Sequence, residues 1–219
     1  LTEANAGLVP ETLQGVETGL AWADDVTAVS ATVFWNRIED AIVNVTIGAG
    51  PGTFPRAGFV PAGGALRQRR NAGTIEATGL ELTATHRIGD RLSLDAALSA
   101  TDAEVDGGTQ AAQLTGLRPA QAPEWSVSAG ADWRATDRLT LVARMRYESA
   151  RFEDDLNSRV LAAALTLDSR VEWTVRDGMS AYVAADNLFD AEVEVLETGD
   201  GIEGYGPPRS LRAGLWLRW

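Results

Sequence analysis

The last eleven residues, from Arg209 to Trp219, constrain the fold of this chain most. From Leu211 onward every second residue is apolar, while arginine, glycine and tryptophan occupy the positions between them. Successive side chains of a β-strand point to opposite faces, so this pattern predicts a strand with one apolar and one charged face. Ten residues of strand extend about 33 Å and cross a bilayer core at a tilt of about 45°. A half-buried strand of a soluble sheet fits this segment equally well, so the rest of the chain must decide.

The same alternation recurs along the chain and predicts nine strands. Turns of two or three residues (24–25, 89–90, 135–137 and 176–178) alternate with longer loops (43–70, 102–123, 153–158 and 197–208). This alternation of short turns and long loops is typical of outer-membrane barrels. The predicted strands cover residues 12–22, 29–35, 80–88, 92–101, 125–134, 139–148, 161–175, 179–187 and 209–219.

Aromatic residues gather near the ends of these strands. Trp125 and Trp133 are eight residues apart on one strand, about 26 Å, so each lies near one edge of a hydrocarbon layer. We therefore predict an all-β, antiparallel up-and-down transmembrane barrel and not a β-sandwich, although a sandwich shows the same alternation. The predicted interfacial aromatic belt consists of Trp22, Trp35, Trp125, Trp133, Tyr147, Trp173 and Trp219.

Composition excludes several classes of protein. No run of about 18 apolar residues is present, which excludes a transmembrane helix. The absence of cysteine excludes disulfides and thiolate metal sites. A net charge of −12 argues against a nucleic-acid partner, because phosphates need a basic face. The N-terminus shows no signal peptide, so we expect either a cleaved leader or a fragment of a longer chain.

Several short segments resemble, in order and spacing, the C-terminal half of the barrel of TonB-dependent outer-membrane receptors. Pro207-Pro208 stands where that family often has glycine before the arginine of the last loop, a departure that would stiffen the loop. The resemblance covers nearly the whole chain. The segments are 8–11, 17–19, 34–42 (Phe-Trp-Asn-Arg-Ile-Glu-Asp-Ala-Ile), 71–73, 79–81, 118–123, 186–190 (Asp-Asn-Leu-Phe-Asp) and the strand after Arg209.

The resemblance implies a receptor of the cell outer membrane that binds a scarce ligand, such as a ferric siderophore, cobalamin or a saccharide. Such receptors move the ligand inward with energy from TonB. They have 22 strands and an N-terminal plug, so residues 1–219 would be the C-terminal part of the barrel, without the plug and early strands. The implied partners are outer-membrane lipid and lipopolysaccharide, the TonB complex through the missing N-terminal segment, and the barrel-assembly machinery through the C-terminal strand. No cofactor is implied. A passive porin-like or structural barrel remains the alternative.

Ligand residues are sought in the long loops. If Trp219 ends at the periplasmic side, the short turns are periplasmic and the long loops extracellular. Arg67, Arg69 and Arg70 close the first long loop and are candidates for contact with an anionic ligand, although lipopolysaccharide or internal carboxylates would also hold them. The arginines and acids of the strands are expected to neutralise one another along the interior wall; these are Arg144, Arg146, Arg170, Arg212, Arg218, Asp132, Asp168 and Glu172.

No catalytic or metal site is predicted. His86, the single histidine, falls on the apolar face near a turn, and we assign it to the interfacial belt rather than to a hydrolase site. Two acidic groups could in principle hold a hard cation, but we favour solvated loop charge. These groups are Asp102, Glu104 and Asp106, and Glu153, Asp154 and Asp155.

Overall fold

A nine-stranded antiparallel sheet dominates the computed structural model, which describes residues 1–71 and 73–218. Each strand pairs with the next long strand along the chain, so the predicted up-and-down order is confirmed. The two edges of the sheet, β2 and β18, do not pair with each other, and the barrel is not closed. The strands are β2 (Thr12–Ala23), β3 (Thr27–Glu39), β8 (Thr74–Ile88), β9 (Leu92–Asp106), β10 (Trp125–Arg134), β11 (Leu139–Glu148), β14 (Ala164–Arg176), β15 (Met179–Asp186) and β18 (Ser210–Leu217).

The predicted loop 43–70 is folded, so this part of the prediction was wrong. Strands β4 (Ile42–Ala49) and β7 (Ala65–Asn71) form a hairpin that carries a smaller one, β5 (Gly52–Phe54) with β6 (Gly58–Val60), and β1 (Thr2–Glu3) pairs parallel to β7. Val43, Val45 and Ile47 alternate with polar residues as in a strand, but the glycine and proline residues that follow led to the prediction of a loop. Val45 is buried in a cluster with Val105, and Val43 and Ile47 pack against that cluster.

Short strands flank the predicted loop 153–158 and occupy part of the predicted loop 197–208, whereas β9 continues to Asp106 into the predicted loop 102–123. Segment 153–158 lies between β12 (Arg151–Phe152) and β13 (Val160–Leu161), and the predicted loop 197–208 holds most of the hairpin of β16 (Glu194–Glu197) and β17 (Glu203–Tyr205). The seventh strand begins at Ala164, and Leu161 is fully buried in β13 rather than placed on the apolar face. A short 3-10 helix, η1 (Ala112–Leu114), follows β9. Residues 1–71 and 73–218 contain no helix with the length and apolar character needed to cross a membrane.

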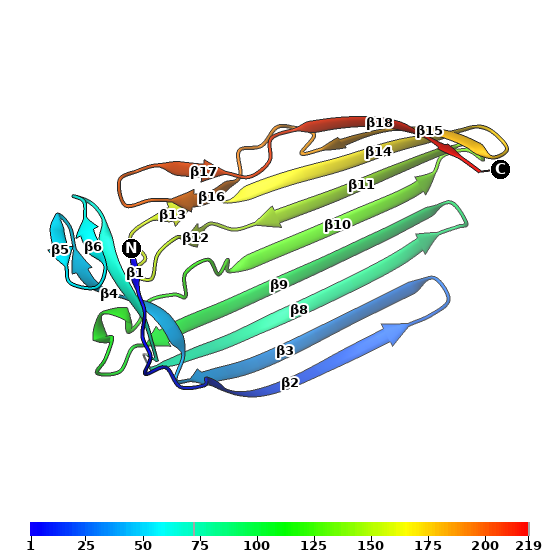
Figure 1. Ribbon diagram of the computed structural model, residues 1–219. Coiled ribbons are helices and arrows are strands. Elements are labelled where there is room, and N and C mark those ends of the chain that lie inside the picture. Colours follow the sequence, from blue (N-terminus) through cyan, green and yellow to red (C-terminus); the bar gives the residue numbers. More distant parts are fainter. Residues whose placement is uncertain (72, 219) are drawn as a thin grey trace.

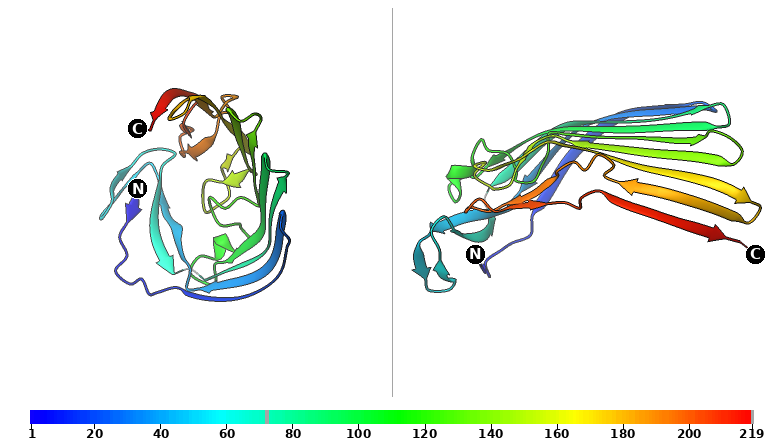
Figure 2. Two further views of the ribbon diagram at one scale, coloured as in Figure 1. Left: turned by 90° about the vertical axis from the view of Figure 1, so that its right-hand side faces the viewer. Right: turned by 90° about the horizontal axis from the view of Figure 1, so that it is seen from above.

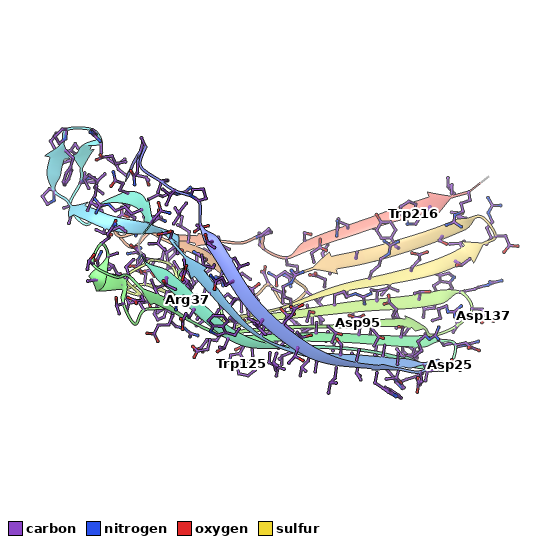
Figure 3. The ribbon with its side chains drawn as sticks, turned by 90° about the horizontal axis from the view of Figure 1, so that it is seen from below. Asp25, Arg37, Asp95, Trp125, Asp137 and Trp216 are labelled. Atoms are coloured by element: carbon purple, nitrogen blue, oxygen red, sulfur yellow. The ribbon has the colours of Figure 1, made fainter. Side chains whose placement is uncertain are left out.

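The two faces of the sheet differ in chemistry. Large apolar side chains on the convex face lie open, with Leu20 84% and Leu211 70% exposed; Figure 3 shows Trp125 on this convex side. The concave face carries charged side chains such as Asp132, Arg144 and Arg170. The hairpins of the long loops gather at one end of the sheet, on its concave side (Figure 2). In the described part of the chain, no second sheet covers the convex side chains, which excludes a β-sandwich.

Three tryptophans on the convex face lie on one line across the sheet. Register places Trp22 in the same row as Ala129, four strands away, and Trp133 is four residues further along β10. Two strands further across the sheet, the register places Val171 of β14 in the same row as Trp133. Trp173 is two residues further along β14 than Val171, toward the short turn. A shift of one residue per strand corresponds to strands tilted by about 35°, the tilt of closed barrels. The line therefore runs perpendicular to the barrel axis.

The two-faced sheet predicts opposite results for arginine at adjacent positions. Leu98 lies between Leu82 and Val127 on the convex face, whereas Ser99 lies between Glu81 and Ser126 on the concave face. Leu98→Arg should destabilise the folded protein in lipid vesicles by about 2–4 kcal/mol, because hydrocarbon solvates the charge poorly.

Ser99→Arg is the matched control and should change the free energy of unfolding by less than about 1 kcal/mol, because Glu81 and water solvate its charge. The measurement is the urea midpoint of the heat-modifiable folded band. Equal losses in the two variants would contradict the assignment of the convex face to lipid.

Candidate ligand-binding cleft at the loop end

Three segments converge at the end of the sheet where the long loops lie. They are the β4–β7 hairpin, residues 153–159 and the β16–β17 hairpin (Figure 1). The first and third come into backbone contact, since a Cβ atom added to Gly199 would lie 2.5 Å from the carbonyl oxygen of Gly63. Between the three segments is a cleft of about 390 Å³. Side chains of Arg67, Glu153, Arg159, Thr198 and Asp200 line it.

Of the three predicted ligand arginines, the structure places only Arg67 in the cleft. Its Nε lies 3.8 Å from Oδ1 of Asp155. Arg69 is exposed and does not line the cleft; its carbonyl accepts a hydrogen bond from Asn5 Nδ2 at 2.9 Å. Arg70 lies on the other face of β7, and its Nε donates to Gln68 Oε1 at 2.8 Å. Alternation along β7 turns Arg70 to the face opposite Arg67, whereas Arg69 shares the face of Arg67 but does not line the cleft. The prediction of a loop could not foresee either difference.

Asp154 organises the segment that forms the second side of the cleft. Its side chain is only 2% exposed, and Oδ1 accepts hydrogen bonds from the backbone N–H of Ser158 and of Arg159, both at 2.9 Å. Oδ2 accepts a third from the Ser158 hydroxyl at 2.7 Å. Burial opposes ionisation, but these hydrogen bonds outweigh it and hold the pKa of Asp154 below its usual value. The carboxylate therefore acts as the internal scaffold of this turn.

Asn157 joins this segment to the loop after β9. Its backbone is left-handed, with φ of 52°, a conformation that asparagine tolerates. Its side-chain oxygen accepts a hydrogen bond from the N–H of Arg118 at 2.8 Å, and its amide nitrogen donates to the Arg118 carbonyl at 2.9 Å. Two adjacent long loops are thus held together by side chain to backbone pairing, and the second side of the cleft is fixed to the wall.

Asp155 differs from its neighbour. Its side chain is 9% exposed, and neither carboxylate oxygen accepts a hydrogen bond from any described residue. Burial raises the pKa of this carboxyl, while the guanidinium of Arg67 opposes the rise. The predicted acidic group therefore divides into a hydrogen-bonded anion at Asp154 and an unsatisfied buried carboxyl at Asp155. Residues 1–71 and 73–218 contain no group of three or more acidic or histidine side chains placed to hold a metal ion.

The concave wall carries ion pairs of the kind the sequence predicts. Arg144 pairs with Asp132 at 2.5 Å, and Arg170 with Glu172 at 2.7 Å while its guanidinium stacks 4.2 Å above the ring of Tyr182. The predicted partner Asp168 instead accepts a hydrogen bond from the Asn187 N–H at 2.8 Å.

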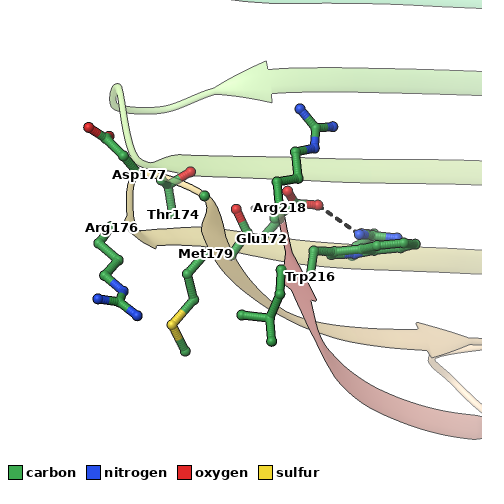
Figure 4. A pocket seen from close by; sticks show the side chains of 11 residues that line it. Glu172, Thr174, Arg176, Asp177, Met179, Trp216 and Arg218 are labelled. Atoms are coloured by element: carbon green, nitrogen blue, oxygen red, sulfur yellow. Dashed lines mark hydrogen bonds and ion pairs between the residues drawn. The ribbon is translucent and has the colours of Figure 1, made fainter.

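Sequence reasoning missed Asp186, which pairs with Arg212 at 2.7 Å. The alternation of β15 places Asp186 on the charged face and could have identified it. Figure 4 shows the hollow at the opposite, short-turn end, where Glu172, Trp216 and Arg218 meet.

The remaining candidates lie away from the cleft. His86 sits near the first short turn, with Nδ1 2.8 Å from the Thr27 hydroxyl. Asp102 is an ion-pair partner of Arg118 at 3.6 Å. Trp219, predicted for the aromatic belt, lies outside the described residues.

Replacing Asp154 tests whether its hydrogen bonds fix the second side of the cleft. Asp154→Asn removes an acceptor oxygen and the charge, so we expect loss of about 1–3 kcal/mol of local stability. Trypsin cleavage after Arg159 in the folded protein should become faster by about tenfold or more.

Asp200→Asn is the matched control, because Asp200 is exposed at the rim of the same cleft. Unchanged cleavage in Asp154→Asn, or an equal increase in both variants, would contradict the scaffold role.

Comparison with known proteins gives a consistent result. Residues 1–188 match the family described as TonB dependent receptor-like, beta-barrel. The chain is 30% identical over 200 residues to the iron-regulated outer membrane virulence protein of Vibrio cholerae serotype O1. The aligned region covers 89% of this chain and 30% of that protein.

Two solved structures share the fold. The ferric yersiniabactin uptake receptor FyuA from Yersinia pestis has a TM-score of 0.74 at 18% identity, over 94% of this chain and 30% of that one. The siderophore receptor PiuA from Acinetobacter baumannii has a TM-score of 0.70 at 15% identity, over 94% and 28%. The chain therefore spans about 30% of the length of the relatives that it matches.

Proposed function

Since this chain belongs to the TonB-dependent receptor-like β-barrel family and to a protein of the cell outer membrane, we propose that it serves uptake of a ferric siderophore driven by TonB. It would supply barrel wall and extracellular loops to that receptor. The observation that carries the proposal is the cleft of Arg67, where three loops meet above a polar concave wall. The iron-related names of the relatives support iron as the cargo, ahead of cobalamin or a saccharide.

The orientation in the membrane follows from the same proposal. The short turns would face the periplasm and the cleft the outside, where ligand arrives. The line of Trp22, Trp133 and Trp173 would mark the inner interface. Near the other end of the strands, Trp35, Trp125 and Tyr147 would mark the outer interface. Tyr147 lies four strands from Trp35 and is displaced by four residues from its row, which is again one residue per strand. Indole and phenol rings suit both levels because one edge of each ring can be wet.

Residues 1–219 would form the C-terminal part of a larger barrel. The edges of β2 and β18 present N–H and C=O groups that hydrocarbon cannot solvate, so further strands must pair with them in the membrane. A plug inside that barrel, the TonB complex, lipopolysaccharide and the barrel-assembly machinery are the further parts and partners of the proposal. Catalysis has no place in it.

Growth of a deletion strain tests the function. On iron-poor medium supplied with single ferric siderophores, cobalamin or sugars, the strain should fail to use at least one ferric siderophore, and the restored gene should rescue growth. Rescue should require TonB. Uptake that persists without TonB would favour the passive porin-like alternative, and undiminished growth on every source would contradict a role in uptake.

Arg67 provides a residue-level test. Arg67→Ala removes one of the two guanidinium groups that line the cleft. Loss of charge-assisted hydrogen bonds of about 1.5–3 kcal/mol should weaken binding of the ferric siderophore about tenfold or more. Arg69→Ala on the same strand is the control, because Arg69 does not line the cleft. Binding by the full-length receptor in detergent is the measurement, and equal affinities in the two variants would remove Arg67 from the ligand site.

A further inference from the structure

Asp155 is a buried carboxylate that the fold does not explain. Its neighbour Asp154 already holds the turn, so the turn does not need a second carboxylate. The side chain of Asp155 is nine-tenths buried, and both of its oxygens lack a hydrogen-bond donor among the described residues. A buried, unsatisfied carboxylate is energetically unfavourable, so a purely structural residue here would be apolar or asparagine.

The group that Asp155 faces is Arg67, one of the two arginines that line the cleft. Arg67 reaches the cleft from β7, and its Nε is the charged atom nearest to Asp155, at 3.8 Å. From the same segment as Asp155, Asp154 adds negative charge and Arg159 positive charge, but Arg159 already lies 3.7 Å from Asp154. Glu153, Glu197 and Asp200 add negative charge along the cleft itself. The carboxylate of Asp155 does not line the cleft itself and offsets the charge of Arg67 from 3.8 Å away.

We propose that Asp155 is a positioning residue whose proton controls how strongly Arg67 attracts an organic anion into the cleft. When Asp155 is ionised, its charge offsets that of Arg67 and weakens attraction of the anion. When Asp155 is protonated, it is neutral and the full charge of Arg67 acts on the cleft. Anion binding should therefore strengthen as the solution becomes more acidic.

The direction of the pKa supports this reading. Burial raises the pKa of Asp155 above the ordinary 3.8 of an aspartate, so it takes up a proton while exposed aspartates are still ionised. The positive potential of the cleft should increase as pH falls through this raised value. Glu153 also has a raised pKa through burial, and it adds to the change from the open side of the cleft.

A small anion can report this potential without knowledge of the ligand. This chain has no cysteine, and Ala62 is exposed at the cleft. A full-length receptor whose sole cysteine is Ala62→Cys can carry a fluorophore there. Quenching by iodide relative to neutral acrylamide measures how strongly the cleft attracts an anion.

We expect Asp155→Asn to raise the iodide to acrylamide quenching ratio at pH 7 by roughly twofold to fivefold, because one negative charge is removed a few ångströms from Arg67. The difference from the parent protein should narrow as pH falls from 7 to 4. Arg67→Gln should lower the ratio at every pH. Asp102→Asn, which alters an exposed acid on β9 outside the cleft, should leave it unchanged.

The heat-modifiable folded band must be present in every variant, so that a lost barrel is not taken for a lost charge. Equal ratios for the parent and Asp155→Asn at pH 7 would overturn the proposal, and so would a difference that persists undiminished to pH 4. The role of Asp155 depends on the proposed function only for the identity of the natural anion, because the iodide experiment measures the charge of the cleft. Failure of ferric siderophore uptake would contradict the proposed function, whereas an iodide ratio that does not change with pH would contradict the role of Asp155.

Discussion

The hydrogen-bond ladder of the nine-stranded sheet is the constraint on which the rest of the structure depends. Hydrocarbon offers no partner for a backbone N–H or C=O, so each strand in the membrane must be paired on both sides. From β2 to β18 every neighbouring pair is antiparallel, and register shifts only between Thr174 and Arg176, at the end of β14 next to a short turn. A constant register over the rest of the sheet lets period-two alternation keep one face apolar across all nine strands.

In a membrane barrel the large apolar side chains lie on the outer surface, whereas in a soluble protein they are buried inside. Large apolar side chains are left on the outside of the wall, and compact apolar packing occurs on the concave face where the β4–β7 hairpin meets the wall. Val105 comes from β9, Val45 from the hairpin, and Ala111 and Leu114 from the loop that follows β9. This small cluster holds the hairpin, and with it Arg67, in a fixed relation to the register of the wall.

Residues that obey a simple period were predictable from sequence. The bounds of β10 and β11, Trp125–Arg134 and Leu139–Glu148, agree with the predicted ranges because alternation there is clean and the turn is short. Most of the loop hairpins were not predictable, because strands such as β5, β12 and β16 have only two to four residues, too few for an alternation to be recognised. The sequence does not distinguish between Arg67, Arg69 and Arg70 as ligand residues. Only the fold of β7 shows that Arg67 reaches the cleft. The contrast between Asp154 and Asp155 likewise arises from contacts that adjacent positions in a sequence cannot reveal.

The three sides of the cleft are attached to the wall with unequal firmness. The β4–β7 hairpin is held by buried apolar contacts, and residues 153–159 by the paired hydrogen bonds of Asn157. The β16–β17 hairpin meets its neighbours through the backbone approach of Gly199 to Gly63 and a hydrogen bond from Arg159 Nε to the Glu197 carbonyl at 3.0 Å. Polar contacts of this kind, of which the Arg159 hydrogen bond is partly buried, open at lower free energy than buried apolar ones. Arg67 therefore belongs to the side of the cleft that is anchored by apolar packing, whereas Glu197 and Asp200 belong to the side that polar contacts hold, including those of Glu194 with Arg151 and Ala162.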